Sequence, residues 1–316
     1  MLTQRGSLRL AGVLFATAFT AIPLFAATPA KPAIEVAVTF DDLPVHSGLP
    51  PGVSRMDIAN SVIATLKAHH APPVYGFVNA TWLDKEPATG EVLRTWVDSG
   101  NLLGNHTFTH MDPNQNPASA FELDLLADEP TLKKYMGLKD WHWLRLPYLN
   151  EGDTPEKRAE IAAFAQAHGY RLAQVTLGFD DWAYNDTYAR CATKGDTAAV
   201  AWMKENMLSR AGADLKLAQT KSQMIYGRNI NNVLLMHIGA FSALMLPQIL
   251  DLYEKNGVKL VTLPQAESDP AYVDGASQHF AWGGSMLDEE AALKNITVPR
   301  EADHDQVMAK LASLCK

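Results

Sequence analysis

Cysteine is scarce in this 316-residue sequence, which contains only Cys191 and Cys315. Neither belongs to a cluster with the spacing of a metal site. No cysteine follows the apolar run near the N-terminus, which excludes a lipoprotein acylation site. If the chain is exported, an oxidising compartment would let the two cysteines pair, and two separate thiols remain the alternative.

Basic residues are also in short supply, with 27 Lys and Arg against 35 Asp and Glu and a formal net charge of −8. An acidic protein is poorly suited to nucleic acid or to anionic membrane surfaces, so we expect neither as a partner. The hydrophobic content of 47% is ordinary for a soluble globular protein. Internal repeats and low-complexity linkers are absent.

One apolar run of some length does occur, at Leu10–Phe25. Arg5 and Arg9 precede it and small residues follow it, which is the order of a secretory signal peptide. We therefore expect a signal peptide at 1–30, cleaved near 26–30, and a periplasmic or extracellular mature protein without stable membrane insertion. Its net charge would be −10, because the removed residues include two arginines and no acid. An uncleaved membrane anchor is the alternative.

After residue 33, short apolar strands alternate with helices, which is typical of a parallel sheet covered on its outer face. The expected strands are 34–40, 74–78, 101–105, 141–146, 171–177, 232–237 and 258–263. The expected helices are 54–69, 91–98, 118–136 with a break at Pro130, 155–168, 196–221 and 241–255. Seven such units predict an α/β barrel, either closed or incomplete.

Two segments do not follow the repeat. The interval 183–231 is too long for a simple crossover, so we interpret it as an insertion beside the site, before the sixth strand. Residues 267–316 lack a strand–helix repeat and are expected to pack as a C-terminal extension on a catalytic domain at 33–266.

Polar side chains suited to catalysis follow five of the strands. In α/β barrels the active site lies at the carboxyl ends of the strands, so we expect these residues to converge on one rim. Asp41 and Asp42 can take different roles, because adjacent residues of an extended segment point to opposite sides. The other strand ends carry His106 with His110, Arg145 with Tyr148, Asp181 with Trp182, and His237.

The spacing of His106 and His110 suits a metal site. Histidines four residues apart lie on one face of a helical turn and can direct both imidazoles at one ion. Zinc suits two imidazoles and a carboxylate, although Co²⁺, Ni²⁺, Mn²⁺ and Fe²⁺ accept the same ligands. Taken singly, each of these residues could instead be a helix cap, a salt bridge or part of the core. Their occurrence at successive strand ends favours one shared site.

Taken in order, the motifs resemble those of the polysaccharide deacetylases, the NodB-homology proteins of carbohydrate esterase family four. The resemblance covers about residues 34–266 and implies a distorted (β/α)7 barrel and metal-dependent deacetylation. The motifs are Thr39-Phe40-Asp41-Asp42, Asn105-His106-Thr107-Phe108-Thr109-His110, Arg145-Leu146-Pro147-Tyr148, Asp181-Trp182 and Leu235-Met236-His237.

The resemblance also implies roles for the metal-side residues. Asp42, His106 and His110 would be the metal ligands. Asp41 would be the general base, and Arg145 would tether it and keep it ionised and aimed.

On the substrate side, Tyr148 would offer its backbone N–H to the oxyanion. His237 would be the general acid, oriented by Asp181. Trp182 and Leu235 would form the wall of the pocket for the acetyl methyl group.

The chain departs from the family pattern in loops that would line the substrate groove, at Leu43, Leu146, Leu149 and Ile238. The expected function is that of an exported hydrolase acting on carbon–nitrogen (non-peptide) bonds. Its substrate would be an N-acetylated amino-sugar glycan such as peptidoglycan or a chitin-like polymer. The alternatives are an O-acetyl polysaccharide esterase, a small-amide hydrolase and a non-catalytic carbohydrate-binding protein.

Overall fold

The computed structural model describes residues 1–2, 34–276, 283–301 and 303–316. The chain divides into two units, Met1–Pro32 and Ala33–Lys316. The expected signal peptide at 1–30 lies outside the described residues except for the first two. Among the residues that are described, no helix is long and apolar enough to cross a bilayer.

Seven parallel strands form a curled half-barrel in the second unit, in the order β5-β4-β3-β2-β1-β6, with β7 paired to the start of β1. Beyond β5, Leu177 bridges to Leu234 of β6, so the two ends of the sheet approach each other. The expected α/β fold of the distorted (β/α)7 type is confirmed. The strands are β1 (Ile34–Leu43), β2 (Tyr75–Val78), β3 (Leu102–Asn105), β4 (Trp143–Leu144), β5 (Arg171–Leu172), β6 (Asn232–His237) and β7 (Val258–Leu260).

Strand β1 pairs with three strands of this sheet, β2, β6 and β7. It continues three residues beyond the expected end at Phe40, because its ladder with β6 extends to Asp41 and His237 and its ladder with β2 extends to Leu43 and Val78. Strands β4 and β5 are shorter than expected. One backbone hydrogen bond extends the pairing of each strand: Arg145 N–H donates to Asn105 O, and Ala173 N–H donates to Leu144 O.

Helices follow the strands much as expected, and the side chain of Ser54 caps the first one. The expected break at Pro130 is wrong. Helix α4 runs through this proline because its buried face, which includes Leu125 and Leu132, packs into the core and offsets the lost backbone bond. The helices up to β5 are α1 (Arg55–Ala68), α2 (Thr81–Lys85), η1 (Pro87–Thr89), α3 (Gly90–Asp98), α4 (Ala118–Met136), η2 (Pro147–Leu149) and α5 (Pro155–Ala167).

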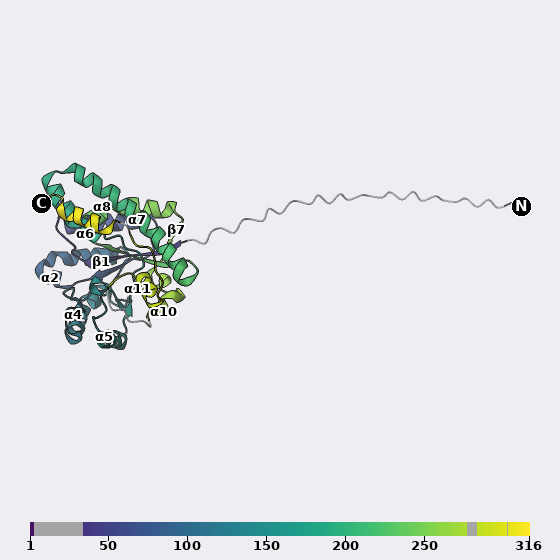
Figure 1. Cartoon of the computed structure of the whole chain (residues 1–316), viewed down its shortest axis with the longest axis horizontal. Coiled ribbons are helices and arrows are strands. Elements are labelled where there is room, and N and C mark those ends of the chain that lie inside the picture. Colours follow the sequence, from purple (N-terminus) through teal and green to yellow (C-terminus); the bar gives the residue numbers. More distant parts are fainter. Residues whose placement is uncertain (3–33, 277–282, 302) are drawn as a thin grey trace. The chain divides into compact units, whose positions relative to one another are not determined.

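The segment before β6 forms two helices, α6 (Trp182–Lys194) and the 30-residue α7 (Thr197–Tyr226), where one helix was expected. Both pack against α8 (Ala240–Lys255), and the three lie together on the side of the strands opposite α4 and α5 (Figure 1). In the described part of the chain no strand follows β7. The helices there are α9 (Leu263–Ala266), α10 (Pro270–Ala276), α11 (Met286–Leu293) and α12 (His304–Ser313).

The two cysteines are joined in a disulfide, which settles the choice that the sequence leaves open. Cys191 lies in α6 and Cys315 follows α12, so the bond ties the C-terminal residues to the segment before β6.

Candidate active site

The carboxylate of Asp41 is buried at the end of β1 and is held by Arg145. Arg145 Nη1 lies 3.0 and 3.2 Å from the two carboxylate oxygens, Nη2 donates to Thr39 Oγ1, and Nε donates to Ala173 O. Burial raises the pKa of Asp41 above its ordinary value, and the adjacent guanidinium acts against that rise. Arg145 therefore fixes the position of Asp41 and limits the cost of burying its charge.

The three expected metal ligands lie together, with their ligand atoms within 4.8 Å of one another. Asp42 Oδ1 is 3.6 Å from His106 Nε2 and 3.7 Å from His110 Nε2. His106 Nδ1 donates to Arg145 O at 2.7 Å, which leaves Nε2 as the nitrogen with a free lone pair.

The protonation of these groups fits a divalent cation. Burial lowers the pKa of His106 and of His110 to about 4, so both rings are neutral at pH 7. Burial would raise the pKa of Asp42, but its hydrogen bond with His46 and the neighbouring imidazoles hold that pKa well below the usual range. Two neutral imidazoles and one carboxylate face one another, which is a donor set that zinc and similar ions accept.

The expected helical turn between His106 and His110 is wrong. The residues after β3 form a bend, in which Thr107 and His110 have φ of 60° and 61°. Asp124 of α4 accepts from both the backbone N–H and the hydroxyl of Thr109 and so holds the bend. The two imidazoles still contact each other, with ring centroids 4.7 Å apart, because the loop turns back on itself instead of forming a helical turn.

His237, at the end of β6, is held by a single carboxylate. Asp181 Oδ1 is 2.8 Å from His237 Nδ1, and Asp181 Oδ2 accepts from the backbone N–H of His237 and from Ser242 Oγ. Burial alone would lower the pKa of His237, but the Asp181 carboxylate raises it to about 9. The preceding residue, Asp180, faces away from this pair and bonds to Arg210 and His304.

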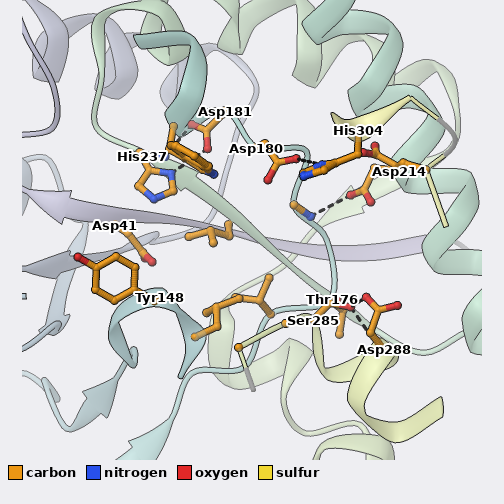
Figure 2. A pocket seen from close by; sticks show the side chains of 18 of the residues that line it. Asp41, Tyr148, Thr176, Asp180, Asp181, Asp214, His237, Ser285, Asp288 and His304 are labelled. Carbon is orange, nitrogen blue, oxygen red and sulfur yellow. Dashed lines mark hydrogen bonds and ion pairs between the residues drawn. The ribbon is translucent and has the colours of Figure 1, made fainter. Parts of the chain in front are cut away.

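These residues line a cavity of about 1070 Å³. Figure 2 shows Asp41, Tyr148 and His237 at one end of it, and Asp214 and Asp288 toward the other. Two exposed aromatic rings flank the candidate metal ligands: Tyr148 is 62% exposed, packs against His110 and has φ of 59°, and Trp182 is 50% exposed. The expected pocket residue Leu235 also lines the cavity.

The structure thus brings all ten expected site residues to one rim of the half-barrel, nine of them lining the cavity and Arg145 directly behind Asp41. Sequence reasoning missed His46, whose Nδ1 is 2.7 Å from Asp42 Oδ2. The signal that could have found it is its position four residues after Asp42, immediately beyond a turn containing proline.

Comparison with known proteins finds one matching family model and solved structures of the same fold. Residues 28–173 match the family model described as polysaccharide deacetylase. An uncharacterised 30.6 kDa protein of Geobacillus stearothermophilus is 25% identical over 127 residues. That match covers 40% of this chain and 44% of the relative, so it spans less than half of either protein.

Two solved structures share the fold. One is a mutant, with restored enzymatic activity, of a carbohydrate esterase family 4 pseudoenzyme from Bacillus anthracis; it is 15% identical, with a TM-score of 0.52 over 74% of this chain and 68% of that one. The other is the chitin deacetylase of Colletotrichum lindemuthianum, 18% identical, with a TM-score of 0.52 over 74% of this chain and 87% of that one.

Proposed function

We propose that this chain, which is homologous to the polysaccharide deacetylases, is a metal-dependent hydrolase that removes N-acetyl groups from an amino-sugar glycan. The observation that carries the proposal is the side-by-side arrangement of three groups: the Asp42, His106 and His110 ligand set, the buried Asp41, and the His237–Asp181 pair. These are the parts that hydrolysis of an amide needs: a site for a cation, a base and an acid.

The metal ligands would be Asp42, His106 and His110, and zinc is the ion that suits them best. When bound, such an ion supplies Lewis-acid polarisation of the acyl carbonyl and makes a nearby water more acidic.

The remaining steps belong to the chain's own residues. Asp41, aimed by Arg145, accepts a proton from the attacking water. His237 Nδ1 is committed to Asp181, so Nε2 is the atom that delivers a proton to the departing amine. The backbone N–H of Tyr148 would stabilise the oxyanion, and Trp182 with Leu235 would bound the acetyl methyl group.

Peptidoglycan and chitin-like polymers are the proposed substrates, supported by the family match and by the similarity of fold to a chitin deacetylase. An O-acetylated polysaccharide or a small amide would suit the same groups. A non-catalytic glycan-binding role is the candidate of another class, since one structural neighbour is a pseudoenzyme. The presence of both Asp41 and His237 favours catalysis, because a degenerate binder would be expected to lose one of them.

We further propose that the protein works outside the cytoplasm, in the periplasm or the surrounding medium. The signal-like N-terminal sequence and the Cys191–Cys315 disulfide support this location, because such bonds persist in oxidising compartments.

Acetate release from peptidoglycan, N-acetylglucosamine oligomers and acetylated xylan tests the function, with and without chelator and added zinc. We expect zinc to restore release after chelation, and Asp41→Asn to abolish it while leaving metal binding in place. Release from xylan alone would favour the esterase alternative. If the protein binds metal but releases acetate from none of these substrates, a small amide becomes the favoured substrate. If the protein binds no metal and releases no acetate, the glycan-binding role is favoured.

A further inference from the structure

His46 lies beside the candidate metal ligands but has no part in the mechanism above. Only 13% of its side chain is exposed, and it borders the cavity. Its ring centroid is 4.7 Å from that of His237, and its Nε2 is 3.5 Å from Trp182 O. It therefore stands between the Asp42 carboxylate and the His237 imidazole.

The contacts of Asp42 divide its two carboxylate oxygens between different partners. Oδ2 is 2.7 Å from His46 Nδ1, whereas Oδ1 faces the Nε2 atoms of His106 and His110. An ionised carboxylate only accepts hydrogen bonds, so Nδ1 of His46 must carry the hydrogen. One oxygen of Asp42 is thus held by His46 while the other is directed at the two histidines.

The backbone that carries His46 is itself anchored. Arg55, the first residue of α1, donates from Nη1 to His46 O at 3.1 Å. The preceding residue, Val45, is buried, and Gly48 N–H donates to Asp186 Oδ1 at 2.8 Å. These contacts therefore hold the loop that carries His46 in place.

We propose that His46 is a positioning residue that sets the orientation of the Asp42 carboxylate for the bound cation. The inference rests on the metal centre of the proposed function. Without the bond to Oδ2, the carboxylate can rotate about its Cβ–Cγ bond, and Oδ1 loses its fixed direction toward His106 and His110. Removing such an outer partner from a metal ligand typically weakens metal binding by roughly 10- to 100-fold.

Two near-isosteric substitutions distinguish the roles of the two ring nitrogens of His46. His46→Asn keeps an N–H donor near the position of Nδ1, His46→Gln places its amide near the position of Nε2, and His46→Ala removes both. His70→Ala, at an exposed histidine after α1, is the matched control. Zinc affinity of the metal-free protein is measured by competition with a chromophoric chelator, alongside the absorption spectrum of the cobalt-loaded protein and the thermal midpoint without metal.

We expect His46→Asn and His70→Ala to bind zinc as wild type does, and His46→Gln and His46→Ala to bind it roughly 10- to 100-fold more weakly with an altered cobalt spectrum. Equal zinc affinity in wild type and all variants overturns the role of His46 and leaves the metal centre standing. If His46→Asn and His46→Gln weaken zinc binding equally, the role of His46 is also overturned, because the N–H donor at the position of Nδ1 would then make no difference. If His46→Ala does not fold, the Asn and Gln pair decides. A wild-type protein that binds no metal removes both the metal centre and the role of His46.

Discussion

At the residue scale, left-handed backbone conformations concentrate at the site. Asp42, Thr107, His110, Tyr148 and Asp180 all have φ between 57° and 64° although none is glycine. Such conformations cost free energy and are retained where the surrounding structure holds them, commonly at functional sites. Four of these residues, Asp42, His110, Tyr148 and Asp180, line the cavity.

The charge state of His237 gives a prediction at this scale. In the metal-free protein, its ring should remain protonated at neutral pH and lose its proton near pH 9, because Asp181 stabilises the charged form despite burial. Asp181→Asn removes that charge and should move the pKa of His237 downward. Titration followed by NMR of the imidazole nitrogens measures both values. An unchanged pKa in Asp181→Asn would contradict the assigned cause.

At the scale of secondary structure, the helix after His237 begins without a cap of its own. Gly239 precedes α8, and Asn185 of α6 replaces the missing cap: its Oδ1 accepts from Phe241 N–H and Ser242 N–H. Its Nδ2 donates to Asp181 O and Ser242 Oγ. Asn185 therefore joins α6, α8 and the residue that holds His237.

Asn185→Ala should lower the free energy of unfolding by at least about 2 kcal/mol, because it leaves several buried polar groups without partners. Asn60→Ala, at an exposed position of α1, should change it by less than about 0.5 kcal/mol. Urea denaturation monitored by tryptophan fluorescence compares the two. A loss below about 1 kcal/mol for Asn185→Ala would mean that water replaces the cap.

At the scale of the whole molecule, the C-terminal residues are tied to the barrel at several points. Met286 N–H donates to Val175 O, and Gly283 N–H donates to Asn150 Oδ1. Arg210 of α7 is paired with Glu301, and the disulfide closes 124 residues of chain. The extension thereby contributes part of the cavity wall.

The double substitution Cys191→Ala and Cys315→Ala should lower the free energy of unfolding by about 2–5 kcal/mol, because it frees a long loop in the unfolded chain. Denaturation of this variant and of wild type, each with and without reductant, measures the difference. Reductant should destabilise wild type and leave the variant unchanged. Equal stability of both proteins under oxidising conditions would contradict the prediction.

The alternation of strands and helices and the placement of polar residues at strand ends could be predicted from the sequence alone. These features depend on periodicity and on contacts within a few residues, so a single chain segment carries them. The ordered motifs also indicated a resemblance to one family, whose model matches residues 28–173, and a fold that the structure and its structural neighbours confirm.

Four features could not be predicted from the sequence: the bend between His106 and His110, the early ends of β4 and β5, the pairing of the two cysteines, and the bond of His46 to Asp42. Each depends on packing between elements or on the path of a loop. Local patterns do not encode those contacts, because their free energy is gained only once the half-barrel has brought distant strand ends together.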